Sequence, residues 1–468
     1  MFKAEQIDPN QRLFWLASIV IATAVVGAAL IKVSSWLVIA VLAAVVIAVF
    51  SFLAPKYSLY LLLVAMLLSP EFEVAKLPGG HIRDITLRYE DLLLVIIGTA
   101  WFMKTAINKE LGLFIRTPLN RAIGAYLVVC LISTLMGMQA GRVKGITGFL
   151  YVLKYFEYVV IYFMAVNILK EKKQVERFLA VMLIVCFITC IVGLIQVPAG
   201  DRVTAPFEGE VGEPNTMGGY LILMISVILG LLLTNERKTV KPFLLLLLLL
   251  CVITLALTLS RGSWVALIPM VITLIYFTDK KSAIIIPLIF IIAFSPILLP
   301  QSVKDRFYYT FMQPHDRGEF EIAGFRLDTS TSARLASWKR VLTKDLGRHP
   351  VLGYGVTGHA FVDAQYPRTL VETGILGLSC LIILLSTIFR HALRVYRQTK
   401  DLFFKGLTLG YLVGFVGLVF HGFGANTFII VRIMEPFWFL TAMITMIPQL
   451  EYGAILHRPD DKAKTVSD

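Results

Sequence analysis

Long apolar runs separated by short polar segments recur along almost the whole chain. A transmembrane α-helix needs about 20 predominantly apolar residues, and fewer than about 17 is short for a full span. Fourteen runs reach or approach this length, and two of them are shorter than 17 residues. They lie at 14–31, 35–53, 57–69, 91–107, 122–138, 147–169, 178–198, 216–234, 242–259, 263–277, 282–299, 369–389, 404–420 and 427–448. The pattern predicts an all-α integral membrane protein, a polytopic bundle of about 12–14 transmembrane helices.

Polar segments divide this bundle into parts. We expect about eleven transmembrane helices in residues 1–299 and about three in 369–450. The long polar segment 300–368 lies between them and is expected to contain short helices, and residues 451–468 form a tail. Composition agrees with this class, because 57% of residues are hydrophobic, 16% are charged and the mean hydropathy is +0.77. Soluble globular domains do not have such a composition.

The charged residues indicate how the helices are oriented. The formal net charge is +13, but the basic residues gather in alternate short loops, so nucleic acid is not the expected partner. The basic loops are 104–121, 170–177, 237–241, 280–281 and 390–400. Basic loops mark the cytoplasmic side, so the N-terminus and the tail are predicted to be cytoplasmic. Arg142 and Lys144 are modest exceptions.

The same alternation places the remaining loops on the outer face. These are 70–90, 199–215 and 300–368, together with the short turns 260–262 and 421–426. Loop 199–215 is acidic, with four carboxylates against one arginine. In a bacterium this face is the periplasm, where no nucleotide sugar is available.

The sequence gives no sign of a metal site or another cofactor. The five cysteines all lie in apolar runs, and their spacing matches neither a metal-binding motif nor a disulfide framework. We interpret them as small core residues. No aspartate pair or histidine cluster suggests a divalent metal ion.

The most informative stretch is 334–376, at the end of the long polar segment. Leu335, Trp338, Val341 and Leu342 form one apolar stripe at helical spacing. Ser332 is the expected N-cap of this short helix, and a stop signal follows at Gly347 and Pro350, before further glycines at 353, 355 and 358. Irregular polar backbone belongs at a wet membrane face or a polar cavity. We interpret the stretch as the floor of an active site.

This stretch resembles the O-antigen ligase and O-antigen polymerase family of bacterial envelope enzymes. In that family an arginine and a tryptophan precede a Pro-apolar-Leu-Gly-x-Gly turn, and a tyrosine precedes a Leu-x-Glu-x-Gly helix start. The matching residues here are Arg334, Trp338, 350–355, Tyr366, Leu370, Glu372 and Gly374. One departure is important, because Asp363-Ala364 stands where the family usually has His-Asn.

Two shorter motifs extend the resemblance. Ser260-Arg261-Gly262 is similar to a short signature of the family, and Pro214-Asn215 resembles a Pro-Asn motif that follows an arginine, here Arg202. The resemblance implies that Arg202, Arg261 and Arg334 bind a pyrophosphate, which suits the two-oxygen fork of arginine. Simpler roles are a membrane anchor for Arg261, a helix cap for Asn215 and a surface charge for Arg334.

The general base is either Asp363 or His359. A carboxylate or an imidazole can accept the proton of an acceptor hydroxyl, whereas the simpler role of Asp363 is to neutralise Arg368 or another arginine.

Further substrate-binding candidates are Asn215, Tyr366, Glu372 and His421, the last near Asn426. Glu372 also fits a helix N-terminal charge. Arg432 and Glu435 are three residues apart and are expected to form an ion pair.

The resemblance implies a metal-independent, inverting glycosyltransferase in the bacterial inner membrane with its active site facing the periplasm. The donor is an undecaprenyl-pyrophosphate-linked glycan, and the reaction polymerises O-antigen or exopolysaccharide repeat units. An alternative is a ligase that uses a lipid A core or a protein as acceptor. Candidate partners are membrane lipid and envelope polysaccharide assembly proteins. A flippase or transporter for lipid-linked sugars and an assembly scaffold are alternatives of other classes.

Overall fold

The computed structural model describes residues 35–75, 85–107, 115–199, 202–208, 212–234, 239–312, 321–322, 325–326 and 329–456. Thirteen of the fourteen predicted runs lie in helices, and the run 14–31 lies outside the described residues. The helices are α2 (Ser35–Leu53), α3 (Pro55–Leu68), α4 (Tyr89–Ile107), α5 (Asn120–Gln139), α6 (Gly145–Ile168), α7 (Lys172–Gln196), α8 (Pro214–Thr234), α9 (Lys241–Leu257), α10 (Arg261–Phe277), α11 (Ser282–Leu298), α14 (Gln365–Gln398), α15 (Leu402–His421) and α16 (Val431–Leu456).

Seven of the described helices are long and apolar enough to cross a membrane: α5, α6, α7, α8, α14, α15 and α16. Shorter apolar helices occur in α2, α3, α9, α10 and α11. The predicted all-α, polytopic membrane fold is thereby confirmed. Two small antiparallel hairpins add little to it: β1 (Glu71–Ala75) pairs with β2 (Ile85–Arg88), and β3 (Glu321–Ile322) pairs with β4 (Phe325–Arg326).

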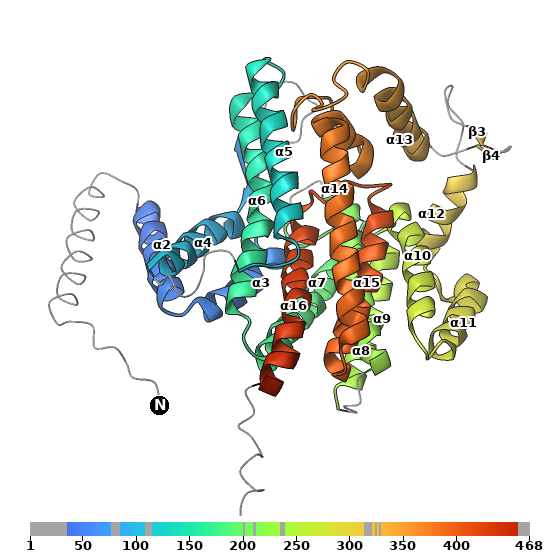
Figure 1. The fold of residues 1–468 in the computed structure, drawn as a ribbon. Coiled ribbons are helices and arrows are strands. Elements are labelled where there is room, and N and C mark those ends of the chain that lie inside the picture. Colours follow the sequence, from blue (N-terminus) through green and yellow to red (C-terminus); the bar gives the residue numbers. More distant parts are fainter. Residues whose placement is uncertain are drawn as a thin grey trace, which may run out of the picture.

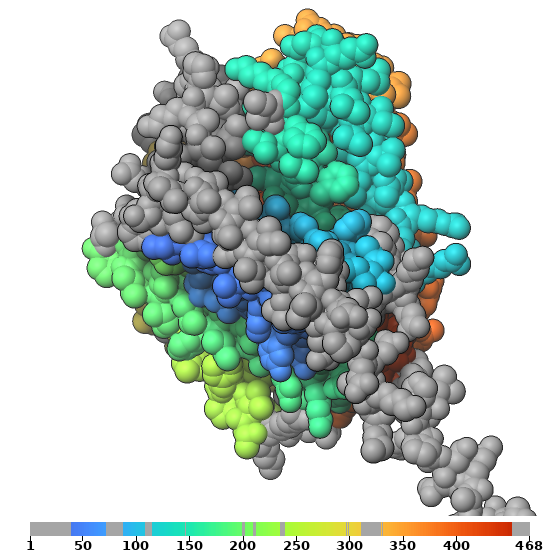
Figure 2. All heavy atoms as spheres, turned by 90° about the vertical axis from the view of Figure 1, so that its left-hand side faces the viewer, coloured from blue at the N-terminus to red at the C-terminus, as the bar shows by residue number. Residues whose placement is uncertain are grey.

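Helices α8, α15 and α16 are the most deeply buried of the seven. Helices α8 and α15 approach closely because small residues face each other. A Cβ atom added to Gly230 would lie 2.3 Å from the Gly406 carbonyl oxygen, and one added to Gly410 would lie 2.6 Å from that of Ser226. Small residues permit such backbone approach between helices in membranes. Figure 2 shows another side of the molecule, where the amino-terminal helices (blue) lie between α5–α6 (cyan) and green segments that follow them.

Loops with the same predicted orientation meet at the same end of the bundle. At one end, Gln365 N donates to Gly422 O at 3.0 Å and Asn426 Nδ2 donates to Val362 O at 3.0 Å. We call this end, with segments 202–208, 258–263, 350–365 and 421–430, the outer-loop end. At the other end, Tyr396 Oη donates to Phe277 O at 2.8 Å. We call it the basic end.

A short helix, α13 (Thr329–Arg340), packs beside the start of α14 (Figure 1). The sequence placed its N-cap at Ser332, which is wrong because the helix begins three residues earlier. It continues into one π-helical turn, Val341–Asp345, in which Leu346 N donates to Val341 O. Along this turn Val341 is buried but Leu342 is 53% exposed, so Leu342 does not belong to the predicted apolar stripe. The wider turn changes which side chains face inward.

The orientation of the two ends can be measured by single-cysteine labelling. In a background with the five native cysteines replaced, we expect an impermeant thiol reagent to label Leu342→Cys in outer-permeabilised cells. Lys173→Cys, at the basic end, should stay unlabelled until the inner membrane is opened. The reverse pattern would place the outer-loop end in the cytoplasm and contradict the orientation inferred from the basic loops.

Candidate functional site

The Ser260-Arg261-Gly262 motif forms the start of α10. The Ser260 side chain is the N-cap and accepts a hydrogen bond from Ser263 N at 3.4 Å. Arg261 is the first residue of the helix, so its guanidinium adds to the positive end of the helix dipole. A helix N-terminus reinforced by an arginine is suited to binding an anion.

A chain of hydrogen bonds links this helix start to two other segments. Ser260 Oγ donates to Asn215 Oδ1 at 2.7 Å and lies 2.8 Å from Ser263 Oγ. Ser263 Oγ is hydrogen-bonded to His421 Nε2 at 3.1 Å, and His421 Nδ1 to Thr427 Oγ1 at 2.8 Å. The structure thus brings together the predicted residues Asn215 and His421, far apart in sequence.

Asn215 does not have the capping role that the sequence suggested. Helix α8 begins at Pro214, so Asn215 lies in its first turn, and its side-chain oxygen accepts from α10 instead. Close packing makes this contact possible, because a Cβ atom on Gly218 would lie 2.0 Å from Ser263 Oγ. His421 and Asn426 are both buried, and Asn426 donates to the Val362 carbonyl oxygen. In this conformation they support the outer-loop turns from below.

Arg202 joins Arg261 at the outer-loop end. Its Nε donates to Thr258 O at 3.2 Å and its Nη2 donates to Leu259 O at 3.0 Å. Partial burial lowers the pKa of Arg202 from its ordinary value, and the positive charges of Arg306 and Arg261 lower it further. Arg261 and Arg306 therefore lie near enough for their charges to act on Arg202, and positive charge from three segments at one end of the bundle attracts an anion. Arg306 was not among the sequence candidates.

Strained backbone marks the turns around this group. Within the described residues, the non-glycine positions with positive φ are Phe207 (60°), Leu259 (52°) and Thr357 (66°), and all three lie at the outer-loop end. A bulky residue in this region costs on the order of 1–3 kcal/mol and needs support from its surroundings. Arg202 supplies it at Leu259, whose carbonyl oxygen it binds.

Arg432 supports the second strained turn. Its guanidinium donates to the carbonyl oxygens of Leu67 (2.9 Å), Ser69 (3.2 Å) and Phe207 (3.4 Å), and also to that of Pro206. It also pairs with Glu71 Oε1 at 3.4 Å.

The expected ion pair between Arg432 and Glu435 is therefore wrong. The Arg432 guanidinium donates to main-chain carbonyl groups, and the Glu435 carboxylate has no hydrogen-bond partner among the described residues. In the segment 202–208, burial raises the pKa of Glu208 to about 7, although the positive charge of Arg432 lowers it.

Arg334 on α13 pairs with Asp363. Arg334 Nη2 and Nε lie 3.1 and 3.3 Å from Asp363 Oδ2, and both side chains are partly exposed. One turn further along α13, the Trp338 ring stacks on Phe423 with centroids 6.2 Å apart and an interplanar angle of 8°. Phe423 also contacts Tyr366, whose hydroxyl donates to Val419 O at 2.6 Å. This aromatic contact fixes α13 beside the turn that holds His421, with which Arg334 interacts electrostatically.

The glycine-rich turn and the start of α14 hold each other through main-chain bonds. Tyr354 N donates to Val371 O at 2.9 Å, Gly355 N to Glu372 O at 2.8 Å, and Ile375 N to Pro350 O at 2.8 Å. Gly374 breaks the helix with φ 69°, and a Cβ atom there would lie 2.2 Å from Val351 O. The two family motifs, 350–355 and 370–374, are thus one backbone unit.

Glu372 and His359 lie inside this unit. Glu372 is buried, pairs with Arg368 Nε at 3.1 Å and accepts from Thr357 N at 3.2 Å. His359 Nε2 lies 3.2 Å from Asp345 Oδ2, and Nδ1 lies 3.0 Å from the Ala360 carbonyl oxygen. Arg368 is thus paired with Glu372, whereas Asp363 is paired with Arg334.

Residues 244–372 match a family model described as "Wzy_C: O-Antigen ligase". This segment is similar to the O-antigen ligase family. The resemblance to the O-antigen ligase and polymerase family is confirmed on just over a quarter of the chain. No curated protein matches the chain.

The matched segment contains most of the candidate site. Six of the nine candidates lie within it: Arg261, Arg334, His359, Asp363, Tyr366 and Glu372. The three remaining candidates lie outside it but are attached to it: Arg202 through Thr258 and Leu259, Asn215 through Ser260, and His421 through Ser263. The match to an O-antigen ligase model supports a glycosyltransferase of ligase or polymerase type, and the apolar helices indicate a multi-pass membrane protein.

The interlocked turn can be tested with two glycine substitutions. We expect Gly374→Ala to lower the melting temperature and to abolish activity, because the added Cβ atom meets Val351 O and because φ is positive. Gly347→Ala is the matched control in the same segment, since the added Cβ atom would lie 3.9 Å from its nearest neighbour, the Lys344 carbonyl oxygen. Thermal unfolding in detergent measures both. Equal melting temperatures would contradict the main-chain lock.

Proposed function

We propose that this protein polymerises O-antigen or exopolysaccharide repeat units on the periplasmic face of the bacterial inner membrane. The donor is an undecaprenyl-pyrophosphate-linked glycan, and the acceptor is a sugar hydroxyl of another lipid-linked repeat. One observation carries the proposal: Arg202, Arg261 and Arg306 gather at the positive end of α10, within the family segment and next to it. Such a group suits a pyrophosphate leaving group.

The arginines stabilise charge that develops as the donor bond breaks. The acceptor oxygen forms a bond to the anomeric carbon from the face opposite the pyrophosphate, so the configuration inverts. The carbon–oxygen bond to phosphate breaks, and both electrons leave with undecaprenyl pyrophosphate. Preorganised cations aimed at the departing oxygens lower the barrier by electrostatic stabilisation. The N-terminal dipole of α10 adds to their effect.

The acceptor proton goes to Asp363 in this proposal. A carboxylate offers about four lone-pair positions, so the contacts from Arg334 leave sites for an acceptor hydroxyl. His359 is the weaker candidate, because both of its ring nitrogens already face oxygen atoms of Asp345 and Ala360. Arg334 then has two tasks: it orients the Asp363 carboxylate and extends the positive region toward the donor. Asn215 and His421 hold the start of α10 in place, while Tyr366 and Glu372 fix the neighbouring backbone.

An O-antigen ligase is the second candidate, and the match of residues 244–372 to an O-antigen ligase model favours it. The absence of the His-Asn pair at 363–364 favours the polymerase. Both candidates use the same donor and the same arginines, so the acceptor is the difference between them.

Purified protein in lipid nanodiscs, incubated with lipid-linked repeats alone, tests the choice. We expect a ladder of products on a gel. A single new product that forms only when a lipid A core acceptor is added would indicate a ligase. Unchanged repeats with both acceptors, together with movement of lipid-linked sugar across a proteoliposome membrane, would indicate a flippase and contradict the proposal.

Arg261→Ala should abolish the ladder in protein that still inserts and folds. Arg261→Lys should restore little activity, because a point charge does not reproduce a fork that binds two oxygens. Arg348→Ala is the control, since this arginine is exposed and lies in the turn that follows the π-helical segment Val341–Asp345. Folding is checked by melting temperature, and wild-type rates in Arg261→Ala would remove the donor site from the proposal.

Asp363→Asn tests the base. The substitution keeps an oxygen that accepts from Arg334 but removes the proton acceptor, so the rate should fall by about 10²–10⁴-fold with little change in donor binding. Asp363→His should recover part of the rate with an optimum above about pH 6.5, where imidazole is neutral. His359→Ala should keep most of the rate. An active Asp363→Asn with an inactive His359→Ala would move the base to the histidine.

A further inference from the structure

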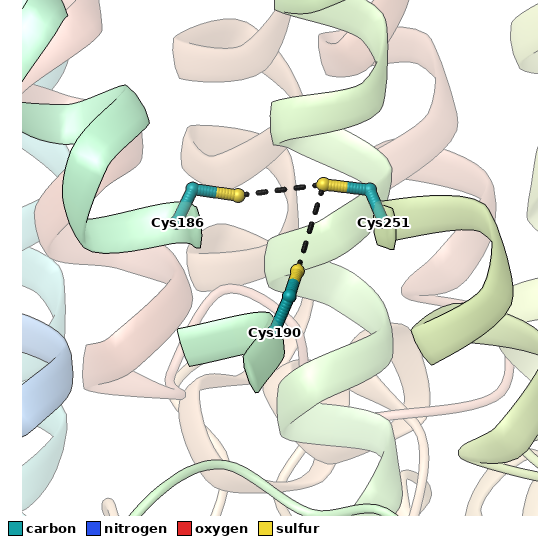
Figure 3. A group of neighbouring side chains, drawn as sticks. All are labelled: Cys186, Cys190 and Cys251. Carbon is teal, nitrogen blue, oxygen red and sulfur yellow. Dashed lines mark hydrogen bonds between the residues drawn. The ribbon is translucent and has the colours of Figure 1, made fainter. Parts of the chain in front are cut away.

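Three cysteines that are separated in sequence meet inside the helical bundle. Cys186 and Cys190 are four residues apart on α7 and therefore lie on one face of it, and Cys251 comes from α9. Cys251 Sγ lies 3.5 Å from Cys186 Sγ and 3.7 Å from Cys190 Sγ, and all three sulfurs lie within 4.8 Å of one another. Each residue is fully buried, and Figure 3 shows the three sulfurs directed toward a common point.

These separations fit three sulfur ligands around one ion. Metal–sulfur bonds are about 2.3 Å long, so three ligands in a plane around an ion lie about 4.0 Å apart. The sulfur–sulfur separations of 3.5 and 3.7 Å are a few tenths of an ångström shorter, and rotation about the Cα–Cβ bonds accommodates the difference. A disulfide would need a separation of about 2.05 Å and would leave the third sulfur without a partner.

The number and type of ligands narrow the choice of ion. Thiolates are soft ligands and select monovalent copper, zinc or iron–sulfur clusters. Structural zinc is almost always four-coordinate. Among the described residues, the group contains three cysteines and no histidine, aspartate or glutamate as a fourth ligand. Monovalent copper accepts three sulfur ligands without a fourth. We propose that Cys186, Cys190 and Cys251 bind one monovalent copper ion.

A neighbouring hydroxyl group would support charged sulfur ligands. The Tyr220 hydroxyl on α8 interacts with Cys186, whereas the Thr254 hydroxyl on α9, beside Cys190, donates its proton to the Leu250 carbonyl oxygen at 2.7 Å. Both neighbours are buried. Hydrogen bonds from the surroundings orient metal ligands and reduce the cost of burying their charge.

A cavity at the basic end approaches to within one helical turn of the nearest cysteine. It has a volume of about 500 Å³, and its walls include Glu176, Leu179 and Leu183 of α7 and Leu244 of α9. Cys186 and Cys190 lie three and seven residues beyond Leu183, and Cys251 lies seven residues beyond Leu244, so they continue the same helix faces. The wall of the cavity also contains Asp401 and Lys172, and Lys172 forms an ion pair with Asp401.

Copper at this position would join α7 to α9 below the Arg202 loop. Thr204 N donates to Gln196 Oε1 at the end of α7, and Arg202 Nε donates to Thr258 O directly after α9. The ion would therefore stiffen the frame that carries Arg202. The copper site itself does not depend on which glycosyl transfer the protein performs.

Metal content of the purified full-length protein tests the site. Reduced protein is titrated without oxygen with monovalent copper in the presence of a coloured copper chelator, then desalted, and copper is measured by mass spectrometry. We expect one copper per chain in the wild type and none in Cys251→Ser. Cys380→Ser, which alters a cysteine outside the group, should keep one copper. X-ray absorption should show sulfur neighbours only, at about 2.3 Å.

Thermal unfolding separates loss of the site from loss of the fold. Copper should raise the melting temperature of the wild type and of Cys380→Ser but not that of Cys251→Ser, because a ligand stabilises only a protein that binds it. Equal copper content in all three proteins would overturn the proposal. A bound zinc ion that copper does not displace, or a disulfide within the group in freshly isolated protein, would overturn it as well.

Discussion

The outer-loop end depends on arginine side chains that satisfy main-chain carbonyl groups. Turns in a membrane protein expose oxygen atoms that lipid cannot satisfy, so each needs a donor within the protein. Arg432, which is 1% exposed, binds carbonyl groups at the carboxyl-terminal end of α3 and in the turn after Ala205. It thereby holds two distant loops against α16. Arg202 does the same for the turn between α9 and α10. An arginine has five donors in a fixed plane and stays charged when buried, which suits this use.

This use of arginine gives the site two classes of cation. Buried Arg432 and Arg368 are surrounded by oxygen atoms and serve the fold. At the outer-loop end Arg202 is exposed, Arg261 and Arg306 are partly exposed, and the positive charges of the latter two act on Arg202. Stability and binding thus draw on the same residue type, with burial as the difference. Charge counts from a sequence cannot separate the two classes.

Sequence patterns predicted the helices well because hydrophobic length is a local property. They also predicted Arg202, Arg261, Asn215 and His421 as candidates, and the structure brings these residues to one end of the bundle. The hydrogen-bond partners of individual side chains were harder to predict from the sequence. Asn215 bonds with Ser260 rather than with its own helix, and Arg432 bonds with carbonyl groups rather than with Glu435. Such partners are set by helix packing between distant segments, which spacing along one chain does not contain. The meeting of Cys251 with two cysteines of α7 has the same origin.

The backbone unit formed by 350–355 and 370–376 has a consequence for how such enzymes diversify. Its main-chain bonds join amide and carbonyl groups that almost every residue carries, so its shape depends chiefly on a few glycines, with further hydrogen bonds from the side chains of Ser133 and Glu372. The residue at 363 is mounted on this unit without helping to build it. An aspartate can therefore replace a histidine there without a new fold. In the function proposed above Asp363 takes the acceptor proton, so a substitution at this position would change the proton acceptor while the main-chain unit that carries it keeps its shape.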